Sequence, residues 1–576
     1  MIDLQHDSRE RLMEVTRTLA QWTRLSGTAE ERAAADYVAA RMRESGYTVT
    51  TLEHDAYISL PGPARLAVTR PQPRDIACIT HSMGSATGPA GISGELVYAG
   101  KGQREDFAGI AAAGTFALVD GRATPQRAVE ATRAGVKGLV CISGRIAHEM
   151  CCSPVWGNPS ASTVEQLPRV ILISVNRAEG EELRELCRRG RVEVHVTADV
   201  DTRWTRTPIV QADLAPAHRD ADDTFVMLSG HLDSWYRGAM DNGTANAAMI
   251  EVARLIAGRR SSARRGLRVL FWSGHSHGRY SSSAWYADNY FVELDERCVA
   301  HVNVDCLGAI DADWFGTNSM PETAQLAIDA TRRVAKAELD AHRVGRNSDQ
   351  SFFGIGIPTI LGSISRQQDG ALGWWWHTPE DALDKIDPIR LERDAAIALE
   401  VTERLVMDAV LPLDYAASAV DVRTNLEKVA DVAGQRFDLS PAIREAMRLE
   451  KLCADLAVAT RDAAANDPGG QSRAAAINTC LRQLGRILIP VTYTRAGRHA
   501  HDPALDVAFL PKLDGLRRLA SVSPESDAAR FLSVDLTRAR SELTISLRRA
   551  CATVEACLPP SPAIFRAPTC RVSSAR

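Results

Sequence analysis

The sequence predicts an α/β protein built around a three-layer, mostly parallel sheet, with a β-rich inserted domain and an all-α C-terminal domain. Strand-like and helix-like segments alternate along residues 205–412, which is typical of a parallel sheet covered by helices on both faces. Residues 56–204 hold a series of short β-like runs, and residues 413–558 form one helical pattern after another. We therefore assign residues 1–55 and 205–412 to the sheet domain.

Composition argues against several classes of protein. The chain has 576 residues, of which 45% are hydrophobic and 24% charged, as expected for a globular protein of several domains. Its formal net charge of -4 argues against a nucleic-acid partner. The start lacks a signal-peptide pattern and no stretch reaches roughly 20 apolar residues, so we expect a cytoplasmic protein with no membrane partner. Twelve cysteines without Cys-x-x-Cys spacing indicate neither a disulfide framework nor a thiolate zinc site.

The first elements along the chain are expected to be helices. Residues 8–22 and 28–46 carry apolar residues at helical spacing, and Thr28 with Glu31 forms a capping-box pattern. The inserted domain follows, with a helix-like segment at Pro125–Val136. Its β-like runs are Glu95–Ala99, Phe116–Asp120, Leu139–Ser143, Val170–Ser174 and Val192–Ala198.

The sheet domain resumes near Pro208. Its expected strands are Phe225–Leu228, Leu267–Trp272, Val302–Asp305 and Ile357–Leu361. Its expected helices are Ala245–Ile256, Ser282–Val292, Thr323–Leu339 and Leu391–Val410. The C-terminal domain is expected to contain the helices Pro441–Ala457, Ala474–Ile487 and Asp527–Cys557, and residues 559–576 to form a disordered tail.

An imidazole and two carboxylates gather where the first of these strands ends. His231 and Asp233 follow the strand directly, and Asp241 lies in a glycine-rich turn before the next helix. Ligands of open α/β sheets bind at this carboxyl edge. Imidazole and carboxylate oxygens suit Zn²⁺, with Mn²⁺ and Fe²⁺ as alternatives. A His-x-Asp in a polar surface loop is the simpler alternative for this motif alone.

The stretch His-Leu-Asp-Ser-Trp followed by Gly-Ala-Met-Asp-Asn-Gly-Thr resembles the metal-binding signature of the co-catalytic zinc metallopeptidases, a family of aminopeptidases and glutamate carboxypeptidases. The resemblance implies that His231 is a metal ligand, that Asp233 orients this histidine and that Asp241 bridges two metal ions. It also implies two further ligands, Asp305 at the end of its strand and His377 in the segment Trp-His-Thr-Pro-Glu-Asp. One or two zinc ions are therefore expected, with manganese or iron possible.

The chain departs from the family at one position. The family has two consecutive glutamates, a general base and a ligand of the second metal, where this chain has His275 and Ser276, followed by His277. Three accounts are open. One histidine replaces the ligand while the other serves as the base, since histidine is a competent base near neutral pH. Alternatively, the site holds a rearranged mononuclear centre with other chemistry, or catalysis is lost and the chain is a binding scaffold.

Two other regions also resemble this family. The runs "GELVYAG", "GTFALVDG" and "AVEATRAGVKGLVCIS" are similar to a protease-associated domain, which implies that residues 56–204 cover the site, although a passive spacer is the alternative. Residues 413–558 resemble a helical dimerisation domain, which implies a homodimer, although these helices could equally pack on their own chain.

The expected function is that of a metal-dependent hydrolase. It would cleave an amide bond in a peptide or small N-acyl compound through a metal-activated water. His275 and Asp233 are the expected catalytic residues, and His231, Asp241, Asp305, His377 and His277 the expected metal ligands. Tyr280, Arg346 and Trp376 are expected substrate contacts, with Arg279 and Arg366 as further candidates, because a guanidinium suits a carboxylate. The alternatives for these side chains are solvated charge and ordinary packing.

Overall fold

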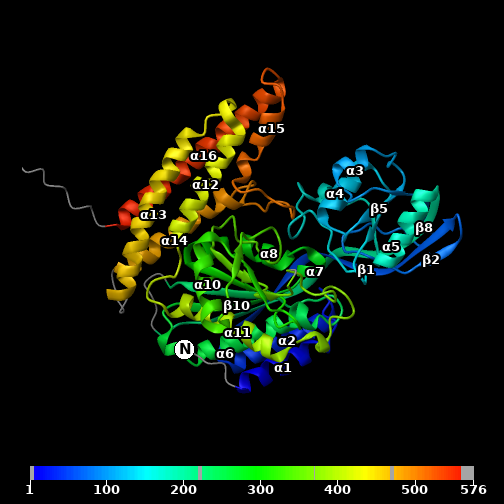
Figure 1. Cartoon of the computed structure of the whole chain (residues 1–576). Helices are drawn as coiled ribbons and strands as arrows, with labels where there is room; N and C mark the ends of the chain where they lie inside the picture. The colour runs from blue at the N-terminus through cyan, green and yellow to red at the C-terminus, as the bar shows by residue number, and fades with distance from the viewer. Residues whose placement is uncertain (1–5, 218–222, 369, 467–472, 559–576) are drawn as a thin grey trace, which may run out of the picture.

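The computed structural model describes residues 6–217, 223–368, 370–466 and 473–558. The predicted tail, residues 559–576, lies outside the described residues. The sheet domain forms the base of the molecule, with the C-terminal helices above it on one side and the inserted domain on the other (Figure 1).

Four parallel strands form the centre of the sheet domain, in the order β14-β11-β9-β10. They are β9 (Phe225–His231), β10 (Gly266–Trp272), β11 (Cys298–Val304) and β14 (Thr359–Gly362). Alternate side chains of β9 enter different cores, Val226 and Leu228 on one face and Phe225 and Met227 on the other. A strand buried on both faces explains the continuous apolar run of the sequence.

Helices cover both faces of this sheet, as predicted. The larger core contains α1 (His6–Leu19), α2 (Ala29–Glu44), α6 (Ala245–Ala257), α10 (Pro321–Ala335) and α11 (Pro388–Met407). The opposite face carries α8 (Ser281–Asn289) and α9 (Phe291–Arg297). Sequence reasoning expected one helix over 282–292, but the backbone leaves the helical region at Tyr290 and divides it in two.

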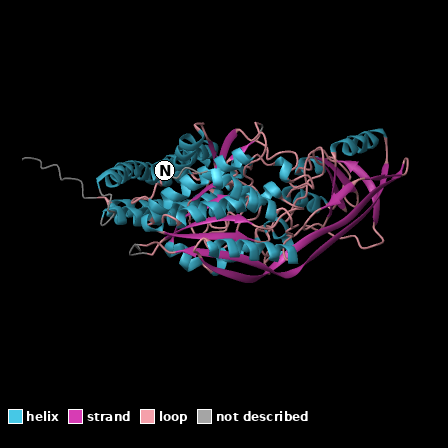
Figure 2. Ribbon diagram, turned by 90° about the horizontal axis from the view of Figure 1, so that it is seen from below, coloured by secondary structure: helices cyan, strands magenta, loops and turns pink. Residues whose placement is uncertain are grey.

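A long two-stranded ribbon joins the sheet domain to the inserted domain. Its strands, β1 (Thr48–Arg70) and β8 (Val192–Leu214), pair antiparallel along nearly their whole length. Strand β8 also pairs with β10 at one end and with β4 (Ile92–Tyr98) at the other, so one sheet runs through both domains (Figure 2). The expected boundaries at residues 55 and 205 fall inside this ribbon and stay a prediction.

The inserted domain contains helices as well as strands. Strand β4 continues in parallel to β5 (Phe116–Asp120), β6 (Gly138–Ile142) and β7 (Ile171–Val175). Shorter strands are β2 (Arg74–Ile76) and β3 (Cys78–Thr80), and the helices are α3 (Arg104–Ala108), α4 (Pro125–Ala134) and α5 (Arg177–Arg189). Sequence reasoning missed α5, whose charged residues and Gly180 conceal a stripe that buries Leu183.

The C-terminal part is helical, as predicted. Its helices are α12 (Tyr415–Ala433), α13 (Ser440–Asn466), α14 (Arg473–Tyr493), α15 (Gly515–Ser521) and α16 (Asp527–Cys557). A small second sheet near the parallel strands consists of β12 (Trp314–Asn318), β13 (Asp340–His342) and β15 (Ser365–Arg366). Within the described part of the chain, no helix combines the length and the apolar character that crossing a membrane requires.

Candidate metal centre

Four of the predicted ligands meet at the carboxyl edge of the parallel strands. His231 ends β9, Asp305 follows β11, and Asp241 lies in the turn η2 (Ala239–Thr244) that leads into α6. His231 Nε2 is 3.0 Å from Asp241 Oδ1 and 3.4 Å from Asp305 Oδ1. His377 Nε2 is 3.0 Å from the other oxygen of Asp241, Oδ2. The Asp241 carboxylate therefore lies between two imidazoles, with one oxygen toward each.

The donor atoms fit a bound metal ion. His231 Nε2 is buried and has no hydrogen-bond partner, although it lies among carboxylates. Donor atoms of His231, His275 and Asp305 lie within 4.8 Å of one another, as do those of Asp241, Asp305 and Cys306. Imidazole, carboxylate and thiolate donors are the usual ligands of zinc.

Cys306 is a donor that sequence reasoning missed. Its φ of +53° is in the left-handed region, and its Sγ lies 3.3 Å from Asp305 Oδ1. Its position directly after the expected ligand Asp305 was the available signal. Burial of the side chain, together with the nearby Asp241 and Asp305 charges, raises the pKa of the Cys306 thiol well above its usual value.

Asp233, the residue expected to orient His231, lies next to the His231 ring. His231 Nδ1 is 2.9 Å from the Asp233 carbonyl oxygen and 3.6 Å from its Oδ1. Ser26 Oγ and the Ser276 backbone N–H each donate to Asp233 Oδ2 at 2.8 Å. Burial alone would raise the pKa of Asp233, but the neighbouring His231 and His277 imidazoles hold it well below its usual value.

Two buried residues that sequence reasoning did not single out hold the ligand loop in place. Asp381 accepts hydrogen bonds from the backbone N–H groups of Met240 (2.9 Å) and Asp241 (3.0 Å), and burial raises its pKa to about 7. The fully buried Arg24 guanidinium donates to the carbonyl oxygens of Leu232 (2.8 Å) and Gly238 (3.0 Å). Both side chains bind backbone atoms of the segment that carries His231 and Asp241, and sequence spacing alone does not reveal such contacts.

His275 is the first residue of the short helix α7 (His275–Gly278) and lies beside the centre. Its ring stacks on His231, with centroids 3.7 Å apart and planes at 12°. Its Nδ1 is 2.8 Å from Asp349 Oδ2, which leaves Nε2 as the ring nitrogen free to accept a proton. His275 is thus placed beside the ligands, where the family glutamate is expected.

The structure does not support His277 as a metal ligand. Its Nδ1 lies 3.0 Å from Ser26 Oγ and 3.8 Å from Asp233 Oδ2, and its ring packs on Trp235. Among the described residues, neither group of metal-competent donors includes it. Two residues along a helix correspond to a rotation of about 200° about its axis, so the His277 side chain points away from the side that His275 occupies.

Arg346 also differs from the prediction. Its guanidinium stacks over Trp156, 3.9 Å from the ring centroid, and donates to the Asp502 carbonyl oxygen at 2.6 Å. It does not line the cavity beside the metal centre. Arg346 instead joins the sheet domain to the C-terminal part, and burial lowers its pKa to about 10.

The cavity beside the ligands has a volume of about 350 Å³ and contains the other expected substrate contacts. Tyr280, Trp376, Arg279 and Arg366 all line it. The Trp376 ring stacks on His377 with a centroid separation of 3.5 Å. The inserted domain contributes Thr124, Pro125, Met150 and Cys151 to the wall.

The inserted domain also contacts the predicted ligand His377 through its backbone. His377 Nδ1 is 2.6 Å from the Glu149 carbonyl oxygen, and the Glu149 N–H donates to the His377 carbonyl at 2.9 Å. One residue earlier, His148 Nδ1 lies 2.6 Å from the Trp376 carbonyl oxygen. A carbonyl acceptor on Nδ1 leaves Nε2 of His377 to bind metal. These contacts argue against a passive spacer.

Burial raises the pKa of the Glu149 side chain to about 8, against 4.5 for a free glutamate. A raised carboxyl pKa stabilises the fold at low pH, and this contribution is lost as pH rises from the unfolded pKa through the folded one. We therefore expect the unfolding free energy of metal-free protein to fall between pH 5 and pH 8, by up to roughly 1.4 kcal/mol per pH unit from this group. Urea unfolding of Glu149→Gln should show a flatter pH dependence. Glu105→Gln, at an exposed site of the same domain, should match the parent, and identical slopes for all three proteins would contradict this assignment.

Known proteins resemble this chain in sequence and in fold. Residues 210–402 match the sequence profile of Peptidase family M28. A probable glutamate carboxypeptidase of Zea mays, VP8, is 23% identical over 507 residues, covering 72% of this chain and 69% of its own length. The aminopeptidase YwaD of Bacillus subtilis is 24% identical over 380 residues, covering 64% and 78%.

Several solved aminopeptidase and M28 peptidase structures share the fold. The aminopeptidase from Aneurinibacillus sp. strain AM-1 has a TM-score of 0.54 and 22% identity, covering 69% of this chain and 94% of that one. The matched profile spans His231, Asp241, Asp305 and His377, the four residues that converge in the structure. Residues 210–402 therefore match peptidase family M28, in a chain similar to aminopeptidases and glutamate carboxypeptidases.

Proposed function

We propose that this chain is a metal-dependent hydrolase that cleaves an amide bond in a peptide or small N-acyl compound. The observation that carries the proposal is Asp241, whose two carboxylate oxygens each lie 3.0 Å from a different imidazole. This is the arrangement expected of a carboxylate that bridges two metal positions. Release of amine from N-acyl amino acids, abolished by a chelator and restored by Zn²⁺, tests it; no release from a broad set of amides with zinc present would contradict it.

The two proposed metal positions are unequal. His231, Asp241 and Asp305 would hold the first ion, with His275 and Cys306 close by. The second position keeps His377 and Asp241, while Ser276 stands where the family has a carboxylate. We infer tight binding of one zinc and weaker binding of a second, with manganese or iron as the other ions that such donors take.

We assign proton transfer and its positioning to individual side chains of the protein. A zinc ion held at this centre supplies Lewis-acid polarisation of the amide carbonyl and of the attacking water. His275 accepts the proton of that water at Nε2 and passes it to the leaving nitrogen. Tyr280, whose ring meets His275 edge-on with centroids 4.8 Å apart, limits the positions that the His275 ring can take.

The cavity favours substrates that carry a carboxylate. Arg279 and Arg366 line it, and among the described residues neither guanidinium has an ion-pair partner. The Nε atom of each is buried without a hydrogen bond. A buried donor is costly to leave unpaired, and a substrate carboxylate would satisfy both groups. We therefore propose an acyl amino acid or peptide with a free carboxyl end, in keeping with the glutamate carboxypeptidase relative.

Replacing either arginine should raise KM rather than lower kcat. We expect Arg366→Gln and Arg279→Gln to raise KM for a free-acid substrate about tenfold, the effect of losing a charge-assisted hydrogen bond of roughly 1.5 kcal/mol. For the corresponding amide-capped substrate, the KM of each variant should equal that of the parent. Arg346→Gln is the matched control, since that arginine lies outside the cavity and should leave KM unchanged. Equal KM values for capped and free substrates with the parent enzyme would contradict the proposed preference for a carboxylate.

We also propose a homodimer, a cytoplasmic location and a protease-associated role for the inserted domain. The C-terminal helices expose large apolar side chains that a partner copy would cover, with Phe531 71% and Met447 56% exposed. All eleven cysteines of the described residues are free thiols, as is usual in a reducing compartment. Sedimentation of the parent and of Phe531→Glu tests the dimer; a monomeric parent would contradict it.

A further inference from the structure

Behind His275 lies a buried chain of hydrogen bonds that the proposed chemistry does not yet use. Asp349 is fully buried, with one carboxylate oxygen 2.8 Å from His275 Nδ1. Its other oxygen accepts a hydrogen bond of 2.8 Å from Ser283 Oγ. Ser283 Oγ is 2.9 Å from Ser351 Oγ, which in turn accepts from the Trp156 indole N–H at 2.9 Å. All four of these residues are buried.

The direction of these bonds follows from the donors involved. An ionised carboxylate can only accept, so Ser283 gives its one proton to Asp349 and must accept from Ser351. Ser351 in turn accepts from the indole N–H of Trp156, which can only donate. The hydrogen bonds from Trp156, Ser351 and Ser283 therefore run in one direction and end at Asp349 Oδ1. The other oxygen, Oδ2, is left to accept from His275. A carboxylate acceptor at Nδ1 fixes the proton on that nitrogen.

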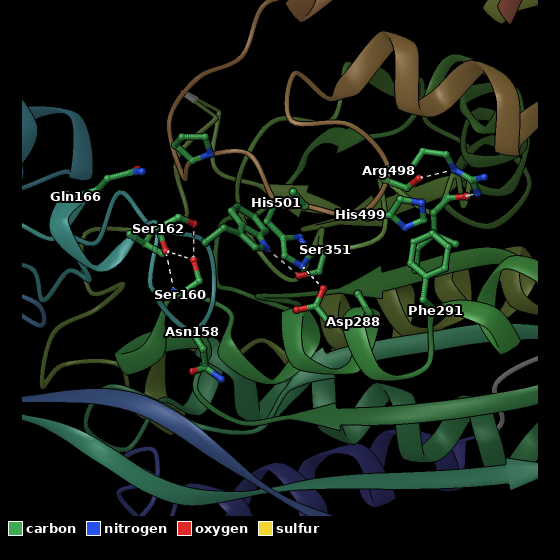
Figure 3. A pocket seen from close by; sticks show the side chains of 18 residues that line it. Asn158, Ser160, Ser162, Gln166, Asp288, Phe291, Ser351, Arg498, His499 and His501 are labelled. Carbon is green, nitrogen blue, oxygen red and sulfur yellow. Dashed lines mark hydrogen bonds and ion pairs between the residues drawn. The ribbon is translucent and has the colours of Figure 1, made fainter.

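The elements involved come from separate parts of the molecule. Ser283 lies in α8, Asp349 and Ser351 lie in the loop before β14, and Trp156 belongs to the inserted domain. This chain of hydrogen bonds ends at the wall of a second cavity of about 490 Å³, which Trp156 and Ser351 line. Ser351 is labelled in the view of this cavity (Figure 3). The inserted domain therefore contributes to the positioning of His275 through Trp156. This contribution is separate from the residues it supplies to the wall of the cavity beside the metal centre.

We propose that Asp349 is the positioning residue of His275, held in place by Ser283, Ser351 and the inserted domain's Trp156. It keeps the imidazole in the Nδ1-protonated form with Nε2 free toward the metal centre, stacked parallel to His231. The inference rests on the proposed function in so far as His275 is the base. The tautomer of His275, however, can be measured without any reaction.

Asp349→Asn is the most informative substitution. Ser283 continues to donate to the side-chain oxygen, so the new amide group faces His275 Nδ1 and drives the ring proton to Nε2. We expect kcat to fall about 100-fold, because a general base without its free nitrogen loses that contribution. KM should stay within about threefold, since substrate contacts are elsewhere. Ser283→Ala should cost about tenfold, as is typical of second-layer contacts.

Asp288→Asn is the matched control. Asp288 also pairs with a histidine, lying 3.0 Å from His501 Nε2, but stands at the second cavity outside the hydrogen-bond chain. Its replacement should leave kcat unchanged. An Asp349→Asn enzyme with parental kcat would overturn the proposal.

Nitrogen-15 NMR of metal-free, histidine-labelled protein supplies a readout independent of turnover. The His275 signals are assigned by their loss in His275→Gln. We expect a protonated Nδ1 in the parent and a protonated Nε2 in Asp349→Asn. A protonated Nε2 in the parent would overturn the positioning role even if hydrolysis occurs. The expected tautomer in a protein that hydrolyses nothing would instead count against the proposed function alone.

Discussion

Replacing Asp241 by Asn lowers the turnover of amide hydrolysis by about 10³-fold or more. The reason is its double contact: the carboxylate faces His231 with one oxygen and His377 with the other, so its loss weakens both metal positions. Metal polarisation is worth several kcal/mol at the transition state, and each 1.36 kcal/mol is a factor of ten. Initial rates at saturating substrate and zinc measure the effect.

Asparagine has the shape of aspartate, so the variant should fold. Asp311→Asn is the control, since Asp311 is exposed and has a φ of +58°, where asparagine is well tolerated. Turnover within tenfold of the parent for Asp241→Asn would remove the bridging role.

Replacing His275 by Gln should lower kcat by about 10²- to 10⁴-fold, the usual contribution of a positioned base. His277→Gln is the paired comparison, because that ring contacts Ser26, Asp233 and Trp235 and lies outside both donor groups. We expect a smaller loss there, about tenfold, through its support of Asp233. Steady-state kinetics of the two variants with a single substrate separate these roles.

Metal content of the His275 variant separates the accounts left open by the missing glutamates. Retained metal with lost turnover identifies His275 as a base. Metal lost together with turnover identifies it as a ligand, because its donor atom lies within 4.8 Å of those of His231 and Asp305, and would favour a rearranged mononuclear centre. Parental kinetics would move the proton transfer to another residue.

The sequence predicted most of the fold because its cores repeat simple patterns. The parallel strands appear as unbroken apolar runs, since both faces of each are buried, and α16 was predicted with the bounds it has in the structure. The ribbon of β1 and β8 was missed over much of its length. Its side chains alternate between buried and exposed, and several exposed positions hold Arg, Thr and Asp, so that apolar content alone does not mark it.

The sequence predicts site residues well where a motif assigns each of them one role. It predicts them less well where the three-dimensional arrangement decides which of two nearby residues reaches the site. His231, Asp241, Asp305 and His377 converge as the motifs indicated. His275 and His277 stand two residues apart, and only the helical turn at α7 shows which one reaches the centre. Arg346 illustrates the same limit, because a guanidinium near a site motif can equally bind backbone carbonyls of a distant segment, here Asp502.

Elemental analysis of protein purified without chelator shows whether His231, Asp241, Asp305 and His377 form a metal centre. We expect one or two zinc ions per chain for the parent, and loss of that metal from Asp241→Asn measured in parallel. A parent that stays metal-free after dialysis against Zn²⁺ or Mn²⁺, or an Asp241→Asn protein with the same metal content as the parent, would contradict this expectation.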